Sequence, residues 1–304
     1  MSRLSGASIK QRLVNLAHQT GKEAQSVLSL YAQERMLYRI SQSSSKEAFV
    51  LKGGLLLYGR YLFDCRPTID IDLMLDQLVK DEEEAIRDIK AACEVACDDG
   101  IVFASRNMRV LKTSETINRK LIRLRIPWNF VGLPVRGVSL IDIGLGDTIL
   151  VKPINMKFPV LIDGLPSPDI FVYSIEAVIA EKFEAAITLG MINSRLKDYF
   201  DIYMISANER IEGSKLKQQV VATILRRGTV LHINPYIFSK DILNDVVKSQ
   251  EWDVFYEKLG RNEHISFADV LVRIRRFLEP LYLAIVENTE FIGVWDVVNA
   301  KWST

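Results

Sequence analysis

Residues 68–75 read TIDIDLML, and apolar and acidic side chains alternate along them. A period of two is typical of a β-strand that buries only one of its faces. The pattern predicts that Ile69, Ile71, Leu73 and Leu75 face the core and that Asp70, Asp72, Met74 and Asp76 share the other face. It therefore places two carboxylates, those of Asp70 and Asp72, side by side on one strand.

Two carboxylates held this close repel each other unless a cation lies between them. Magnesium is the common solution, because it is a hard cation that prefers oxygen ligands. Asp70 and Asp72 are therefore candidate ligands for magnesium or manganese. The alternative is that they form the solvent-facing side of an edge strand and bind no metal.

Two other segments strengthen the metal-site interpretation. Gly53 and Gly54 stand between a strand-like AFVL and a helical LLLYGRYL, where glycines let the backbone approach a ligand and turn its N–H groups towards phosphate. A tight turn would need the same glycines. In LIDIGLGD, Asp142 lies between two core-facing isoleucines and is the candidate third carboxylate of a phosphoryl-transfer site, with Asp147 as a weaker candidate.

A helical segment further along the chain carries a cation where a core residue is expected. Lys182 falls on the apolar stripe of SIEAVIAEKFEAAITLG, and an unpaired buried ammonium is costly, so we expect it to meet an anion. That anion is either a triphosphate or an acidic side chain, unless the lysine extends to solvent. Arg195, Asp198 and Asp201 follow at a spacing of three, which a purely structural Arg–Asp pair would also explain.

The chain is predicted to be an α+β protein, in which a mixed sheet with flanking helices precedes a mainly helical C-terminal domain. Residues 1–45 are expected to form a helical segment packed on the core, residues 46–165 the α/β domain, and residues 166–304 the helical domain. The boundary is set in a passage that contains four of the nine prolines.

Composition places the protein among soluble cytoplasmic proteins. The 304 residues are 48% hydrophobic and 25% charged, with no apolar stretch long enough for a membrane span and no apolar segment typical of a secretory signal near the start. Three cysteines give no disulfide framework and favour a reducing compartment. We therefore expect a cytoplasmic protein without a membrane partner.

Charge is unevenly distributed although the net charge is only +1. Residues 101–136 hold eight basic residues and one acidic one, and Arg119, Arg123 and Arg125 share one parity of a predicted strand. Such a face suits the phosphate backbone of RNA, and Trp128 and Phe130 are candidates for stacking on exposed bases. The alternative is a solvated face that pairs with the acidic segment 81–99.

Taken together, these motifs resemble the AbiEii-like nucleotidyltransferases, toxins of type IV toxin–antitoxin (abortive infection) systems. The resemblance rests on FVLKGGLLLYGRYL, RPTIDIDL, the short IDI strand and the run EAVIAEKFEAAITLGMINSRLKDYFDIY, and extends to about Asp201. The spacer of fifteen residues between the glycines and the first aspartate is somewhat long for the broader nucleotidyltransferase signature.

The resemblance implies a role for each motif. Asp70 and Asp72 would hold magnesium, Asp142 would be the second acidic motif, and Lys182 would contact the phosphates of an NTP. Asp198 or Asp201 would be the closing acidic residue, with Asp198 favoured as the inner one. Arg195 is a further candidate nucleotide contact; Arg66 and Lys52 are either nucleotide contacts or surface charges.

The resemblance also implies partners: an NTP, an RNA acceptor such as the 3′ end of a tRNA, and a winged-helix antitoxin encoded beside the toxin. Two other hypotheses remain at this point. The first is a nucleotidyltransferase that acts on a protein or small-molecule hydroxyl, and the second is a nucleotide-binding module without transfer activity.

Overall fold

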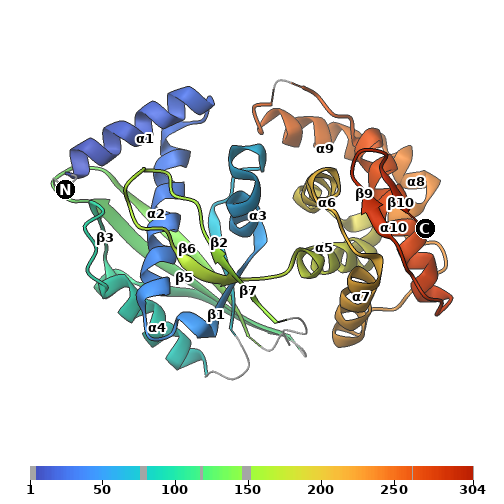
Figure 1. Ribbon diagram of the computed structural model, residues 1–304, viewed down its shortest axis with the longest axis horizontal. Helices are drawn as coiled ribbons and strands as arrows, with labels where there is room; N and C mark the ends of the chain where they lie inside the picture. The colour runs from blue at the N-terminus through green and yellow to red at the C-terminus, as the bar shows by residue number, and fades with distance from the viewer. Residues whose placement is uncertain (1–4, 76–80, 117–118, 146–151, 262, 304) are drawn as a thin grey trace. The chain divides into compact units, whose positions relative to one another are not determined.

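The computed structural model describes residues 5–75, 81–116, 119–145, 152–261 and 263–303 (Figure 1). The chain divides into two compact units, Met1–Tyr173 and Ser174–Thr304. Two predicted acidic residues, Asp76 and Asp147, lie outside the described residues, so their predicted placement is not addressed.

Side chains cap the N-termini of two helices in the first unit. The helices of this unit are α1 (Gly6–Thr20), α2 (Ala24–Gln42), α3 (Gly53–Tyr61) and α4 (Glu82–Glu94), with 3-10 turns at Lys46–Ala48, Leu62–Asp64 and Ser105–Asn107. The Ser5 side chain accepts a hydrogen bond at the start of α1, and Gly21 ends that helix with a φ of 64°. Asp81 caps α4 in the same way, ahead of three glutamates whose charge suits the helix N-terminus.

A mixed sheet forms the centre of the first unit. Its described strands are β1 (Phe49–Lys52), β2 (Asp70–Leu75), β3 (Ile101–Phe103), β4 (Arg109–Thr116), β5 (Arg119–Phe130), β6 (Arg136–Leu145), β7 (Ile154–Lys157) and β8 (Asp169–Val172). They run in the order β3-β5-β6-β2-β1-β8-β7, and β4 also pairs with β5. Strand β2 is antiparallel to β1 and parallel to β6. The predicted α+β class with a mixed sheet and flanking helices is confirmed.

The sheet buries one face and leaves functional residues on the other. Ile71 and Leu73 of β2, Ile122 and Leu124 of β5, and Ile141 of β6 are fully buried. The helices contact the sheet, α2 at β6 and β8, and α3 at β1 and β2 (Figure 1). Alternation along each strand then turns the aspartates to the opposite face.

The burial of two residues, one in β2 and one just before it, differs from the predicted pattern. Met74 is buried although it shares the parity of the aspartates, because it lies over Gly144 of β6, which has no side chain to exclude it. Ile69 was predicted in the core but is 74% exposed. It precedes β2, where the chain is not yet paired with β1 or β6.

The division between the units follows Tyr173, whereas the sequence placed it after residue 165. The proline-rich passage contains β8, which pairs in parallel with β1, and β7, which pairs with β8. These backbone hydrogen bonds keep the chain in the first unit as far as the start of the next helix.

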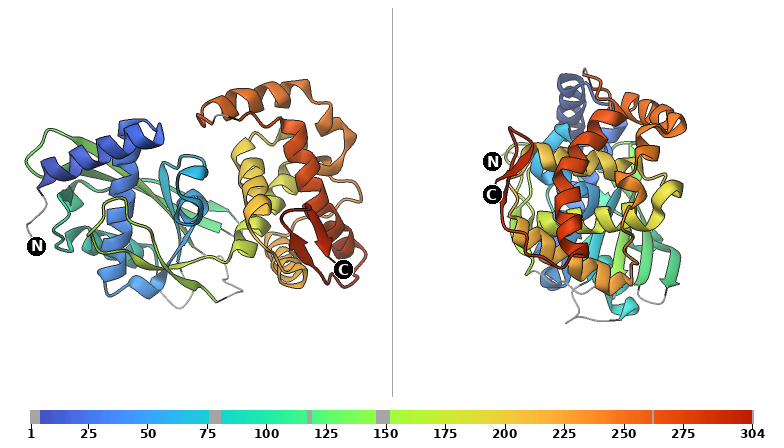
Figure 2. Two further views of the ribbon diagram at one scale, coloured as in Figure 1. Left: turned by 45° about the horizontal axis from the view of Figure 1, so that its top comes forward. Right: turned by 90° about the vertical axis from the view of Figure 1, so that its right-hand side faces the viewer.

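The second unit is mainly helical. It contains α5 (Ile175–Leu189), α6 (Leu196–Asn208), α7 (Gly213–Arg227), α8 (Lys240–Leu243), α9 (Val246–Glu257) and α10 (Phe267–Val286), with 3-10 turns at Gly190–Ile192 and Tyr236–Phe238. A hairpin of β9 (Val294–Asp296) and β10 (Lys301–Ser303) lies beside α10 (Figure 2). Trp295 and Trp302 of this hairpin pack on Phe277 of α10.

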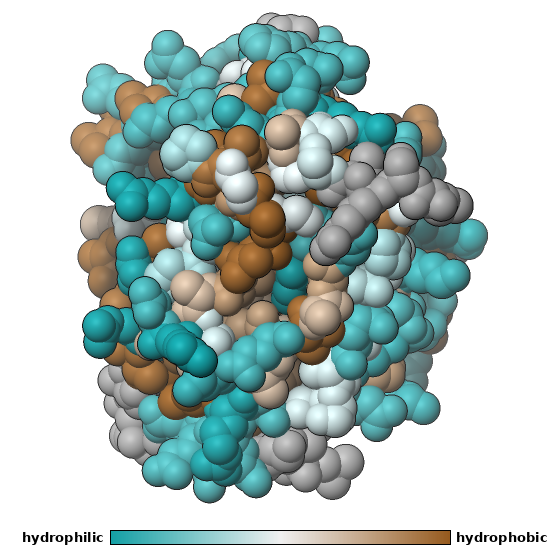
Figure 3. Space-filling model, turned by 90° about the vertical axis from the view of Figure 1, so that its left-hand side faces the viewer, coloured by the Kyte–Doolittle hydropathy of each residue, from teal (hydrophilic) through white to brown (hydrophobic). Residues whose placement is uncertain are grey.

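The surface carries hydrophobic residues among hydrophilic ones, as the face drawn in Figure 3 shows. Single exposed hydrophobic residues of this kind are normal on proteins. Within the described residues, none of the helices combines the length and the apolar character required to cross a bilayer.

Candidate active site

The turn between β1 and α3 brings backbone against an aspartate. Gly53 has a φ of 68°, a left-handed conformation that glycine adopts without penalty. A Cβ atom added to Gly53 would lie 2.0 Å from Oδ2 of Asp72 and 2.7 Å from its Cγ. The carboxylate of Asp72 is therefore packed directly against the backbone at the first residue of α3, and only glycine fits there.

The register of three strands aligns the acidic residues with an arginine. Asp72 of β2 lies opposite Asp142 of β6, and Asp142 lies opposite Arg123 of β5. Asp70 lies two residues before Asp72 on the same face. The predicted grouping of Asp70, Asp72 and Asp142 on one face of the sheet thus follows from strand register.

Arg123 is bound to these acids by its guanidinium. Its Nε donates to Oδ1 of Asp142 at 2.7 Å and its Nη2 to Oδ2 at 2.5 Å, while Nη2 lies 3.6 Å from Oδ2 of Asp70. The hydrogen bond to Asp142 raises the pKa of Arg123 above its ordinary value. The arginine thus places a positive charge against Asp142 and near Asp70.

Asp70 and Asp72 have the donor chemistry that magnesium prefers, two neighbouring carboxylates beside a phosphate-binding type of turn. Among the described residues, however, no three acidic, histidine or cysteine side chains are arranged to hold a metal. Both oxygens of Asp142 accept hydrogen bonds from Arg123. The residues therefore fit a metal held by two aspartates and completed by phosphate oxygens, and Asp142 could join only by exchanging its bonds with Arg123.

The segment that leads into β2 packs on the same turn. A Cβ atom at Gly54 would lie 2.8 Å from Oγ1 of Thr68 and 3.2 Å from Nη2 of Arg66. The guanidinium of Arg66 thus lies beside the first turn of α3, where backbone N–H groups lack helical partners. This position suits the predicted contact of Arg66 with a nucleotide.

Buried polar residues of α2 bind several segments of the first unit, among them the one that leads into β2, and the sequence pattern did not single them out. Gln33 donates from Nε2 to the carbonyl of Ile69 at 2.7 Å. Glu34 accepts from the backbone N–H of Leu161 at 2.6 Å, and burial raises its pKa to about 7. Arg39 binds Asp99 in a bidentate pair. Gln33 and Glu34 stand in the run QER of α2, at positions that the neighbouring buried residues Ala32 and Met36 show to be in the core.

The second unit gathers another set of predicted residues. Nζ of Lys182 lies 2.7 Å from Oδ1 of Asp198 and 2.7 Å from Oδ2 of Asp201, and all three residues are buried. The expectation that Lys182 meets an anion is met by these two carboxylates. Its contact with an NTP phosphate stays a prediction, as does the choice between Asp198 and Asp201, because both bind the lysine.

Arg195 completes this cluster from its more exposed edge. Its Nε lies 2.7 Å from Oδ2 of Asp198, which is the structural Arg–Asp pair that the spacing allowed. Burial opposes ionisation of Asp198, but Lys182 and Arg195 outweigh it and hold the pKa of Asp198 below its ordinary value. Asp198 is thus favoured as a buried carboxylate between Lys182 and Arg195.

The basic face is only partly as predicted. Arg106 and Arg109 are exposed and Arg125 is half-buried, whereas Arg123 is bound to Asp142, and the side chain of Arg119 is outside the description. Trp128 is 2% exposed and Phe130 is fully buried, so the prediction that they stack on RNA bases is wrong. They share the parity of Ile122, Leu124 and Ile126, which face the core.

Comparisons with known proteins bear on these two groups of residues. The family model described as "Nucleotidyl transferase AbiEii toxin, Type IV TA system" matches residues 35–273. No curated protein matches the chain.

Two solved structures share the fold. One is MenT4, a nucleotidyltransferase toxin of Mycobacterium tuberculosis, at 18% identity and a TM-score of 0.54, over 93% of this chain and 99% of that one. The other is JHP933 of Helicobacter pylori, at 15% identity and a TM-score of 0.52, over 88% of this chain and 95% of that one. With a family match that spans both the β1–α3 turn and the Lys182 cluster, the chain belongs to the AbiEii nucleotidyltransferase toxins of type IV toxin–antitoxin systems.

Proposed function

We propose that this nucleotidyltransferase moves a nucleoside monophosphate from an NTP to the 3′ hydroxyl of an RNA, tRNA being the favoured acceptor. The observation that carries the proposal is the packing of Asp72 against Gly53, in register with Asp142. It places carboxylates beside the N-terminus of α3, which is the arrangement needed to hold a metal-bound triphosphate.

In the proposed reaction the acceptor hydroxyl attacks the α-phosphorus of the NTP, and the bond from that phosphorus to the pyrophosphate oxygen breaks. Asp70 and Asp72 would hold magnesium or manganese, which when bound neutralises charge on the phosphate oxygens. The N–H groups of Gly53 and Gly54 and the guanidinium of Arg66 position the phosphates. Asp142 orients or deprotonates the attacking hydroxyl.

Lys182 is proposed to contact the phosphates, with Asp198 and Asp201 fixing the position of its side chain. Each of these carboxylates lies 2.7 Å from Nζ of Lys182. Arg195 would assist on the more exposed edge of the same cluster. These roles come from the family resemblance, supported by the ion pairs within the second unit.

The acceptor is proposed from the charge of the first unit. Arg106 and Arg109 are exposed, and Arg125 lies on the same strand face as Arg123. Cations in this region suit the phosphates of an RNA strand. Because an NTP and an RNA meet in the cytoplasm, we place the reaction there. We further propose a winged-helix protein as the antitoxin.

The test uses purified protein, magnesium, total cellular RNA and each of four NTPs labelled at the α-phosphate. We expect label in a tRNA-sized band with a subset of the NTPs. No label is expected from a γ-labelled NTP, because pyrophosphate leaves. RNA treated with periodate, which destroys the 3′ diol, should accept no label.

Two other outcomes would contradict the RNA proposal. Label on protein or on a small molecule would indicate a different hydroxyl acceptor. Label on periodate-treated RNA would place the modified hydroxyl elsewhere than at the 3′ end. A winged-helix protein encoded beside the toxin should abolish labelling when both are produced together, and an unaffected rate would contradict its role as antitoxin.

A further inference from the structure

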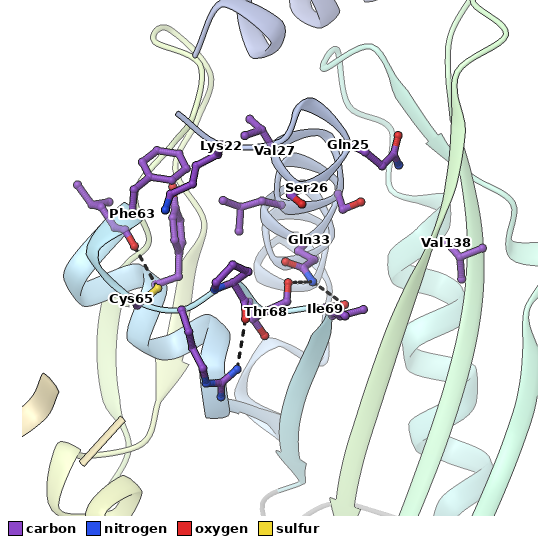
Figure 4. Close-up of a pocket in the computed structure, with 16 residues that line it drawn as sticks. Lys22, Gln25, Ser26, Val27, Gln33, Phe63, Cys65, Thr68, Ile69 and Val138 are labelled. Carbon is purple, nitrogen blue, oxygen red and sulfur yellow. Dashed lines mark hydrogen bonds between the residues drawn. The ribbon is translucent and has the colours of Figure 1, made fainter. Parts of the chain in front are cut away.

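A cavity of about 170 Å³ lies in the first unit, between α2 and the segment that follows α3 (Figure 4). Val27, Leu30 and Gln33 line it from α2, and Leu62 and Phe63 line it from the opposite side. A cavity of about 150 Å³ is large enough to bind benzene. The cavity therefore has room for a single aromatic ring, or for a fused ring that extends into its mouth.

The floor of the cavity is the chain that leads into the active-site strand. Arg66, Pro67, Thr68 and Ile69 line it, and Asp70 is the next residue. The guanidinium of Arg66 lies beside the first turn of α3, as described above. Arg66 therefore belongs both to the cavity lining and to the surroundings of the turn at Gly54.

One buried polar atom in the cavity wall has no hydrogen-bond partner in the part of the chain that the structure describes. Gln33 is 1% exposed, and its Nε2 donates to the carbonyls of Ile69 and Thr68. Its Oε1 accepts no hydrogen bond from any residue within the described ranges. Leaving a buried acceptor unpaired is unfavourable. A ligand with an N–H group would satisfy it.

The cavity also offers aromatic surface where the sheet face does not. The rings of Tyr58 and Phe63 are 5.6 Å apart in an edge-to-face arrangement, and both residues line the cavity. Aromatic rings are the usual stacking partners of nucleobases. Trp128 and Phe130, the aromatic residues that the sequence suggested for this purpose, are buried in the core.

We propose that this cavity is a nucleobase subsite, in which a base packs against Phe63 and the α2 side chains and donates an N–H hydrogen bond to Oε1 of Gln33. The inference deepens the proposed function and rests on it for the direction of the bound nucleotide, with its phosphate near Arg66. The base belongs either to the NTP or to the RNA 3′ end, which share the chemistry recognised here.

The first test leaves the protein unchanged and needs no transfer activity. Adenosine and purine riboside, which differ by the exocyclic amino group, are titrated into the wild-type chain without magnesium. Loss of a hydrogen bond to a buried acceptor should weaken binding by about tenfold, so adenosine should bind more tightly. Equal affinities, or no binding of either nucleoside, would overturn the proposal.

The second test fills the cavity. Ser29 lines it from α2 and is partly exposed, so Ser29→Phe should place a ring in the cavity and weaken nucleoside binding at least about tenfold. Ser249→Phe, on an exposed position of α9, is the matched control and should bind as the wild type does. Unchanged binding by folded Ser29→Phe would contradict the subsite.

To identify the source of the base, the affinities for an NTP and for RNA are measured with and without Ser29→Phe. Both measurements use a chain that also carries Asp72→Asn, so that no transfer takes place. If Ser29→Phe weakens NTP binding and leaves RNA binding unchanged, the donor base occupies the cavity; the reverse result assigns the acceptor base. If neither affinity falls, the subsite is wrong. If the wild-type chain binds nucleosides but labels no RNA, the proposed RNA acceptor is wrong and the nucleobase subsite is retained. Failure of the proposed function and failure of the subsite can therefore be told apart.

Discussion

A single missing methyl group shapes the proposed active site. At Gly53 the backbone takes a φ of 68° and comes into contact with the carboxylate of Asp72. Any side chain there would displace the acid from the position that strand register gives it beside Asp142. The site therefore depends on one residue for both a conformation and a close approach.

Gly53→Ala should consequently abolish transfer while the chain still folds. The left-handed conformation costs alanine about 1–2 kcal/mol, and the new Cβ must push Asp72 aside. We expect the rate of label transfer to fall by at least about 100-fold, as for loss of a catalytic contact.

Gly132→Ala is the matched control for this substitution. Gly132 has a φ of 73° and nothing within 4 Å of an added Cβ, so the variant has the same backbone strain without the clash. It should lose similar stability in a urea titration and keep its activity. Equal losses of activity in the two variants would show that strain, and not displacement of Asp72, is responsible.

At the scale of elements, the second unit is held together by charges as well as by apolar packing. Lys182 of α5 joins Asp198 and Asp201 of α6 in a buried cluster. Breaking a buried ion pair by removing one partner is strongly destabilising, because it leaves an uncompensated charge. The cluster therefore fixes these helices to each other.

The cluster makes stability depend on pH in a defined direction. The pKa of Asp198 is lowered in the folded chain, so its contribution is present above the unfolded pKa of about 4 and is lost as pH falls through the folded value. Asp198→Asn should be less stable than the wild type at about pH 7, and the difference should shrink at about pH 2.5.

Urea titrations followed by tryptophan fluorescence suit this measurement, because Trp252, Trp295 and Trp302 lie in the second unit. Asp163→Asn, at an exposed position of the first unit, is the control and should show no such convergence. If the difference in unfolding free energy between Asp198→Asn and the wild type stays constant over this pH range, the ionised state of Asp198 is refuted.

The C-terminal hairpin provides a second prediction at this scale. Trp295 is 1% exposed, lies 4.8 Å from the ring of Phe277, and donates from Nε1 to the carbonyl of Ser206 at 2.7 Å. Trp295→Ala should destabilise the chain by about 3–5 kcal/mol in urea titrations. Trp302→Ala, at a half-buried position of the same hairpin, should cost less, and equal costs would contradict the assigned packing.

The sequence predicted the elements well where the periodicity was strong. The alternation in TIDIDLML, the glycines before α3 and the helical pattern after Ser174 all correspond to observed elements. The strands of the β9–β10 hairpin were missed because three residues each are too few to show a period. The strands in the proline-rich passage, β7 and β8, were missed because β8 joins the sheet by pairing with β1, which is distant in the sequence.

The sequence predicted which acidic residues of the candidate site share a face, but not which side chains bind them. The face shared by Asp70 and Asp72 follows from local alternation, whereas the pairing of Arg123 with Asp142 depends on the register of β5 and β6. That register is tertiary information, and the same arginine suited an RNA-binding face equally well. Trp128 and Phe130 were wrongly predicted to stack on bases because aromatic residues are common both on base-stacking surfaces and in hydrophobic cores.

At the scale of the whole molecule, the family match spans residues on both units. The first unit contains the paired aspartates and the turn at Gly53, and the second contains the Lys182 cluster. The net charge of +1 hides separate acidic and basic segments. Such segregated charge suits the proposed nucleotide and RNA substrates.

The most direct test of the account compares transfer of α-labelled NTP to RNA by the wild type, by Asp72→Asn and by Asp163→Asn, with magnesium and with excess chelator. Asp163 is exposed, so its variant controls for the loss of a negative charge. We predict transfer by the wild type and Asp163→Asn in magnesium, at least about a 100-fold loss in folded Asp72→Asn, and none in chelator. Transfer by Asp72→Asn at the wild-type rate, or transfer that persists in chelator, would contradict the paired-aspartate site.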